Sequence, residues 1–166
     1  GLDAVVHAAS SLGPVPLRPL ADTRCEDLEL ALATNVLGPF RLTKAVLGAL
    51  ASSAREGRGA VVVNVSSDAG LTPYAGWGAY GASKAALHHL SRIWDAELEE
   101  AGVRVVSFDP GDMDTPLHAA ALPEADPSTL KRPETSAMEL VALVSSHLGA
   151  RDLHAAEVPE AARGPS

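Results

Sequence analysis

The sequence predicts an α/β fold in which a doubly wound parallel sheet lies between two layers of helices, an αβα sandwich. Three short runs rich in alanine and valine, at residues 3–9, 60–66 and 103–108, have the length and composition of buried strands. A longer stretch with apolar residues at helical spacing follows each run. Repeated strand–helix units favour right-handed crossovers, which make the strands parallel and cover both faces of the sheet.

The first unit is the strand over 3–9, a proline-rich loop and a long helix. Thr23-Arg24-Cys25-Glu26 matches a capping box, which predicts the start of that helix. Gly38-Pro39 should kink the helix near its middle, because proline cannot donate a backbone hydrogen bond. The glycines within residues 55–59 predict its end.

The second unit is the strand over 60–66 and a helix over 79–101, with Gly102 as its stop. The inward stripe of this helix includes Leu87 and Leu98, with either Ile93 or Trp94 between them.

The third strand ends at residue 108, and residues 112–131 read as a loop with one short helix. Pro133 then begins a last amphipathic helix that reaches residue 148. We therefore expect one domain over residues 1–149 and an irregular tail over 150–166.

Charge and cysteine content exclude several classes of function. The net charge of −8, without a basic run, argues against a nucleic-acid partner or an anionic membrane surface. No apolar run reaches the length of a membrane span. The single cysteine, Cys25, cannot form an internal disulfide and fits a reducing compartment, so a cytoplasmic location is expected.

Tyr80 and Lys84 are the most informative pair of residues. A spacing of four places both on one helix face, where an ammonium can make a phenol more acidic. Ser67 precedes the tyrosine by thirteen residues, at the end of a predicted strand. In ordinary composition the three residues would have this spacing in roughly 0.3 % of cases. Ser66 is the adjacent alternative to Ser67.

The chemistry converges on one edge of the predicted sheet. Ser67, Pro110 and Gly111 follow the ends of the second and third strands, and Ala9 and Ser10 follow the first. Ligands of open parallel sheets bind beyond the carboxyl ends of the strands, so a site is expected there.

Four motifs resemble the short-chain dehydrogenase/reductase family. They are Asn-Val-Ser-Ser at 64–67, Tyr-Gly-Ala-Ser-Lys at 80–84, Pro-Gly with a following threonine at 110–115, and Asn35 in the preceding helix. The resemblance extends from about residue 3 to residue 148. It implies a Rossmann-type sheet and an NAD(P)-dependent oxidoreductase acting on a carbonyl or secondary alcohol.

The resemblance implies roles for individual residues. Tyr80 would be the proton donor or acceptor and Ser67 would hydrogen-bond the same substrate oxygen. Lys84 would contact the nicotinamide ribose and lower the pKa of Tyr80. Asn35, at the helix kink, would hold a water that links Lys84 to solvent.

Further positions follow from the same resemblance. The cofactor, NAD or NADP, would also contact Ala8, Ala9, Pro110, Gly111, Met113 and Thr115. By their position in the chain, Ala69, Trp77, Leu117 and His118 could line a pocket for a small-molecule substrate. The long loop rich in alanine and proline over residues 116–133 could form a lid. No metal site is expected, because His7, His88 and His89 lack a surrounding cluster of ligands.

The sequence also departs from the family pattern. It contains no Gly-x-x-x-Gly-x-Gly turn to hold the pyrophosphate, and it lacks the βαβ units that precede the first strand in the family. Ser10 stands where the family has glycine and adds bulk near the cofactor. The partial sheet should leave an apolar edge, so we expect marginal stability, association and weak dinucleotide binding.

Two other functions remain open. The chain could be a truncated, cofactor-deficient pseudoenzyme or oligomerisation module, because the long helices over 23–53 and 79–101 resemble those that build homo-oligomers in the family. The same tyrosine–lysine pair could also serve an epimerase or dehydratase.

Overall fold

The three predicted strands form one parallel sheet in the order β1–β2–β3. These strands are Ala4–His7, Ala60–Val65 and Val103–Phe108. Ala4 lies opposite Val61, and Ala60 lies opposite Val103. The first strand is shorter than the predicted 3–9, because the chain leaves the sheet after His7 and exposes Ala8 and Ala9.

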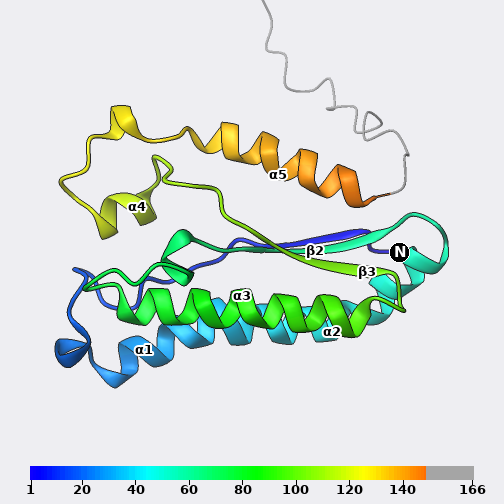
Figure 1. Ribbon diagram of the computed structural model, residues 1–166, viewed down its shortest axis with the longest axis horizontal. Coiled ribbons are helices and arrows are strands. Elements are labelled where there is room, and N and C mark those ends of the chain that lie inside the picture. The colour runs from blue at the N-terminus through cyan, green and yellow to red at the C-terminus, as the bar shows by residue number, and fades with distance from the viewer. Residues whose placement is uncertain (149–166) are drawn as a thin grey trace, which may run out of the picture.

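Helices cover both faces of this sheet, which confirms the α/β sandwich. The structure, a computed structural model, describes residues 1–148, so the tail predicted over 150–166 lies outside the described residues. α1, α2 and α3 lie on one face and α5 lies on the other (Figure 1). Their bounds are Cys25–Leu32 for α1, Gly38–Arg55 for α2, Gly78–Leu98 for α3 and Pro133–His147 for α5.

The main core lies between the sheet and helices α2 and α3. Leu50 of α2 and Leu98 of α3 pack against the valines that alternate along β2 and β3. Trp94 also packs there, whereas Ile93 is 42 % exposed, so Trp94 is the inward residue of the two predicted alternatives. Val61, Val62 and Val63 are fully buried, as expected for a central strand covered on both faces.

The predicted capping box is wrong. Helix α1 begins at Cys25 with Arg24 as its N-cap, and no side chain caps it. The Thr23 hydroxyl instead donates to the carbonyl of Pro19, across the 3-10 turn Leu20–Asp22 (η1). The proline-rich loop therefore folds into its own turn and removes Thr23 from the capping position.

The helix break predicted at Gly38-Pro39 is present as a π-helical turn over Ala33–Leu37 (η2), between α1 and α2. The backbone N–H of Gly38 bonds the carbonyl of Ala33, one residue farther back than in an α-helix. Asn35 lies in this turn with no exposed surface.

The segment after β3 carries the predicted short helix, α4, at Pro116–Ala121, and a 3-10 turn at Pro127–Thr129 (η4). Its two ends are joined by a parallel bridge between Met113 and Lys131, in which the backbone of Lys131 bonds Asp112 and Asp114. Within residues 1–148, none of the helices has both the length and the apolar character needed to cross a membrane.

Candidate active site

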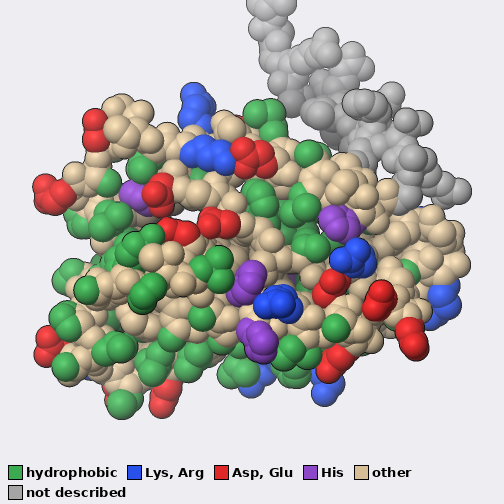
Figure 2. All heavy atoms as spheres, in the orientation of Figure 1, with side chains coloured by type: hydrophobic (Ala, Val, Ile, Leu, Met, Phe, Trp, Pro, Cys, Tyr) green, Lys and Arg blue, Asp and Glu red, His purple; other side chains and the backbone are tan. Residues whose placement is uncertain are grey.

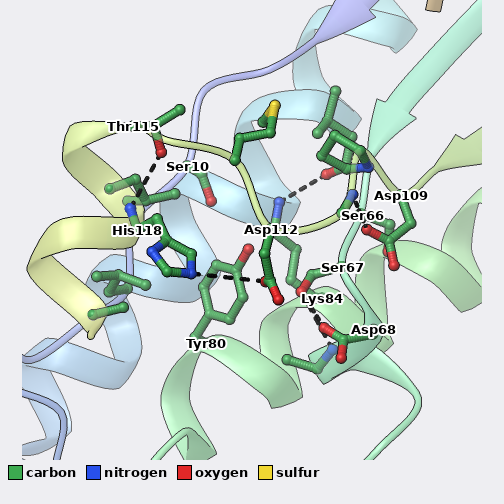
Figure 3. A pocket seen from close by; sticks show the side chains of 18 of the residues that line it. Ser10, Ser66, Ser67, Asp68, Tyr80, Lys84, Asp109, Asp112, Thr115 and His118 are labelled. Atoms are coloured by element: carbon green, nitrogen blue, oxygen red, sulfur yellow. Dashed lines mark hydrogen bonds and ion pairs between the residues drawn. The ribbon is translucent and has the colours of Figure 1, made fainter. Parts of the chain in front are cut away.

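A pocket of about 470 Å³ opens at the carboxyl ends of the strands, where the sequence predicts a site. Segments from the loop after β1, the end of β2, α3, the loop after β3 and α4 contribute its walls (Figure 3). Twelve of the predicted site residues line it: Ala8, Ser67, Ala69, Trp77, Tyr80, Lys84, Pro110, Gly111, Met113, Thr115, Leu117 and His118. Ala9 and Asn35 do not.

Tyr80 and Lys84 lie side by side on α3, as their spacing predicts. Both are buried, with 7 % and 2 % of their surface exposed. The Lys84 Nζ lies 5.5 Å from the centre of the Tyr80 ring and donates a 2.7 Å hydrogen bond to the Val65 carbonyl at the end of β2. The lysine is thereby held between the helix and the sheet.

Burial controls the ionisation of both groups. It lowers the pKa of Lys84 to about 8, against a smaller opposing effect of the Asp109 carboxylate. Burial also raises the pKa of Tyr80, and the carboxylates of Asp109 and Asp68 act in the same direction. The hydroxyls of Ser67 and Ser10 partly oppose this rise.

This result differs from the expectation that Lys84 lowers the pKa of Tyr80. The ammonium points to the Val65 carbonyl, and desolvation of the phenol dominates. The phenol of this pocket is consequently protonated at neutral pH, which suits a proton donor.

Ser67 lies at the start of a 3-10 turn, Asp68–Gly70 (η3), that follows β2. Its hydroxyl accepts a hydrogen bond from Ala69 N at 3.2 Å and donates to the Asp68 carboxylate at 3.1 Å. Ser66 also lines the pocket, but of these two adjacent serines it is Ser67 whose hydroxyl lowers the pKa of the Tyr80 phenol. This favours Ser67 over the adjacent alternative.

Glycine allows this turn to touch helix α3. A Cβ on Gly81 would lie 2.8 Å from the backbone oxygen of Ala69, and one on Gly70 would lie 2.9 Å from the backbone of Lys84. The backbones of the Ser67 turn and the Tyr80 helix are therefore in direct contact, and this contact sets the distance between the two side chains.

Gly81→Ala should destabilise the protein by about 1 to 3 kcal/mol, because backbone atoms cannot yield to the added methyl group as a flexible side chain can. The same substitution at Gly48, in α2 with nothing within 4 Å of its added Cβ, should stabilise by roughly 0.5 to 1 kcal/mol. Urea unfolding of both variants measures the difference. Equal changes at the two sites would contradict the close contact.

Asn35 does not line the pocket but supports it through hydrogen bonds. Its side chain accepts from the backbone N–H of Ser11 and donates to the Ser11 carbonyl and to Ser83 Oγ, each at 2.8 Å. Ser83 Oγ donates in turn to the Tyr80 carbonyl at 2.7 Å. The network joins the segment after β1 to the helix that carries Tyr80. The predicted water link from Asn35 to Lys84 stays a prediction.

The loop after β3 forms the opposite wall. The Pro110 carbonyl accepts hydrogen bonds from Ser136 Oγ and Lys131 Nζ, which tie it to α5 and to the base of the α4 segment. Thr115 Oγ1 caps α4 by accepting from His118 N. The pairing with Lys131 uses the residues on either side of Met113, so the amide and carbonyl of Met113 itself are not part of it.

The pocket wall also contains three acidic residues, Asp68, Asp109 and Asp112. Their spacing in the sequence gives no indication that they belong to the site. Acidic side chains gather between α4 and the helix layer below it (Figure 2). Asp68 accepts a hydrogen bond from the Tyr74 hydroxyl at 2.7 Å, and Asp112 lies 3.9 Å from His118 Nε2. The mouth of the pocket is therefore negatively charged.

His7, outside the pocket, is a packing residue, since it is buried and pairs with Thr43 across the sheet–helix interface. Among residues 1–148, no group of three or more histidine, cysteine or acidic side chains is arranged to hold a metal ion.

Comparison with known proteins gives consistent matches. The profile of the short chain dehydrogenase family matches residues 1–126. The 2,3-dihydro-2,3-dihydroxybenzoate dehydrogenase of Escherichia coli K12 is 40 % identical over 116 residues, which are 70 % of this chain and 44 % of that protein. An NAD-dependent oxidoreductase of Mycobacterium tuberculosis H37Rv is 40 % identical over 116 residues, or 70 % of this chain and 40 % of that protein.

A solved structure shows the same arrangement. NADPH-bound carbonyl reductase from chicken fatty liver superimposes with a TM-score of 0.75 at 25 % identity, covering 87 % of this chain and 58 % of that one. The chain spans 40 % to 58 % of the length of these three relatives, or about half.

Proposed function

The chain belongs to the short chain dehydrogenase family, and from this premise we propose that its pocket is the catalytic part of an NAD(P)-dependent oxidoreductase. The substrate is a carbonyl compound or secondary alcohol, and Tyr80 exchanges a proton with its oxygen. The observation that carries the proposal is the buried Tyr80–Lys84 pair beside Ser67 in one pocket.

The pocket residues fit the nicotinamide end of the cofactor. Lys84 Nζ uses one N–H on the Val65 carbonyl in the described part of the chain, which leaves two donors for the hydroxyls of a ribose. Met113 and Thr115 line the wall from which the carboxamide would be held. When bound, the cofactor supplies or accepts the hydride.

The chain's own residues handle the proton. In reduction, the Tyr80 phenol gives its proton to the carbonyl oxygen as the carbon gains hydride, and Ser67 donates a hydrogen bond to the same oxygen. The phenolate left behind is stabilised by the Lys84 ammonium above its ring. The raised pKa of Tyr80 favours this direction, because the phenol is protonated before the reaction.

The substrate is a neutral molecule with an apolar body. Trp77, Leu117 and Ala121 supply apolar surface, while Asp68 and Asp112 at the mouth repel a carboxylate. We also propose a cytoplasmic homo-oligomer built through α2 and α3, whose exposed Leu42 and Ile93 support such a contact.

A fluorescence titration with reduced nicotinamide mononucleotide tests the cofactor site. Trp77 lines the pocket, whereas Trp94 packs against Phe40 at 5.8 Å, so a Trp94→Phe background reports on Trp77. We expect saturable quenching with a dissociation constant on the order of 0.1 to 1 mM, because only the nicotinamide end is held.

Matched controls locate the binding. AMP should not quench, and Lys84→Met should weaken nicotinamide binding roughly tenfold through its lost hydrogen bonds. Lys44→Met, at an exposed position of α2, should leave it unchanged. Quenching by AMP alone, or equal effects at the two lysines, would contradict a nicotinamide site at Lys84.

A further inference from the structure

The hydroxyl of Ser10 is a buried polar group whose purpose the fold does not explain. Its Oγ is buried from solvent and has no hydrogen-bond partner within residues 1–148. A buried hydroxyl without a partner is costly, and in native proteins such a group calls for an explanation. Ser10 lines the pocket, so its free hydroxyl faces the place where the reaction would occur.

The Ser10 hydroxyl affects the ionisation of the Tyr80 phenol. Ser10 and Tyr80 approach the pocket from different elements, and their oxygen ends converge there, with Ser67 beyond the phenol (Figure 3). The Ser10 and Ser67 hydroxyls both act to lower the pKa of Tyr80, against its burial. Rotation about the Cα–Cβ bond moves the Ser10 oxygen, and rotation about the C–O bond then directs its hydrogen toward the phenolic oxygen.

The backbone next to Ser10 is held in place by hydrogen bonds. The next residue, Ser11, is held through its N–H and carbonyl by the side chain of Asn35. Asn35 continues through Ser83 to the Tyr80 carbonyl. Three consecutive side-chain links thus connect the backbone beside Ser10 to the backbone of Tyr80, and the two hydroxyls cannot drift apart without breaking buried hydrogen bonds.

We propose that Ser10 is a positioning residue for Tyr80: its hydroxyl donates a hydrogen bond to the phenolic oxygen, holds that oxygen in place and stabilises its ionised form. This role rests on the proposed function for its place in the reaction. The hydrogen bond itself can be tested without turnover.

The chain contains only two tyrosines, so Tyr74→Phe leaves Tyr80 as the single phenol. In that background, the near-ultraviolet absorbance of tyrosinate follows the ionisation of Tyr80, while circular dichroism at each pH confirms that the protein is folded. Removing the hydroxyl by Ser10→Ala should lower the acid dissociation constant of Tyr80 roughly three- to tenfold, the effect of one lost hydrogen bond to the ionised form.

Three comparisons make the result specific. Ser10→Gly should match Ser10→Ala, because both lack the hydroxyl, and Ser10→Thr should titrate like the parent. Ser11→Ala should have no effect, because the Ser11 hydroxyl accepts a hydrogen bond from Gly13 N, away from the phenol. An unchanged titration in Ser10→Ala, or an equal shift in Ser11→Ala, would overturn the proposal. Both outcomes would leave the nicotinamide titration untouched, so a failure here is separate from a failure of the proposed function.

Discussion

Tyr80→Phe should lower kcat for ketone reduction by roughly 10²- to 10⁴-fold, the usual contribution of a positioned general acid. The substitution removes one oxygen from a ring that is 7 % exposed and in edge contact with Trp77 at 5.8 Å, so the packing of the pocket is retained. Affinity for reduced nicotinamide mononucleotide should stay the same. The assay uses small aryl ketones with NADH or NADPH at saturating concentration.

Tyr74→Phe is the matched control for this experiment. Tyr74 also lines the pocket, but the residue is 45 % exposed and its hydroxyl donates a hydrogen bond to Asp68. Loss of this hydroxyl should therefore change kcat by less than about threefold. Full activity in Tyr80→Phe would contradict the proton-transfer role of Tyr80. Absence of turnover in the parent chain with both cofactors would contradict the proposed oxidoreductase function itself.

The sequence predicts the positions of the catalytic candidates well because their spacing follows regular structure. Four residues on a helix place Tyr80 beside Lys84, and the end of a buried strand places Ser67 at the sheet edge. The same regularity gave β2, β3 and α5 nearly at their predicted bounds. These predictions depend only on local periodicity and on the rule for parallel sheets.

Contacts that do not follow the regular spacing of helices and strands are what the sequence could not predict. The capping box at Thr23 fails because Pro19 lies within reach of its hydroxyl once the loop folds into a turn. The network from Asn35 to Ser11 and Ser83 joins three separate segments, and no spacing encodes it. Ser10, which in the sequence indicates only added bulk, gains its significance from the phenol that the fold brings to it.

The net direction of the Tyr80 pKa shift also depends on a quantity that spacing does not give, and the lowering expected from Lys84 stays a prediction. Sequence spacing shows that a lysine adjoins the tyrosine, but it does not show how much water the fold removes from either group. In the structure, burial raises the pKa of the phenol and lowers that of the ammonium, so each is moved toward its neutral form. The pocket therefore holds a charge at Lys84 that its surroundings disfavour.

That disfavoured charge predicts a pH-dependent cost to stability. Below about pH 8, Lys84 is protonated in both folded and unfolded chains, and the full penalty of burying the ammonium is present. Between about pH 8 and the model-peptide value of 10.5, the unfolded chain binds a proton that the folded protein has released, so stability rises with pH. Above that range neither state holds the proton and the penalty disappears.

Comparison with Lys84→Met isolates this effect. The variant lacks the titrating group, and its lost hydrogen bond to the Val65 carbonyl is independent of pH. The unfolding free energy of the parent minus that of Lys84→Met should therefore rise by about 2 to 3 kcal/mol between pH 7 and pH 10, as measured by urea unfolding. The range stops at pH 10 because, from about that pH upward, ionisation of Tyr80 in the unfolded chain acts increasingly in the opposite direction, in the parent and in the variant alike.

Lys131→Met provides the reference, because Lys131 is only partly buried and pairs with Glu139 at the surface. The curve for Lys84 should rise more steeply than the curve for Lys131 over the same range. A flat or falling curve for Lys84 would mean that water reaches the ammonium and that its pKa is ordinary. A rising curve would mean that the fold retains a destabilising charge beside Tyr80. A lysine with a purely structural role would not need such a charge, whereas stabilisation of a phenolate during proton transfer explains it.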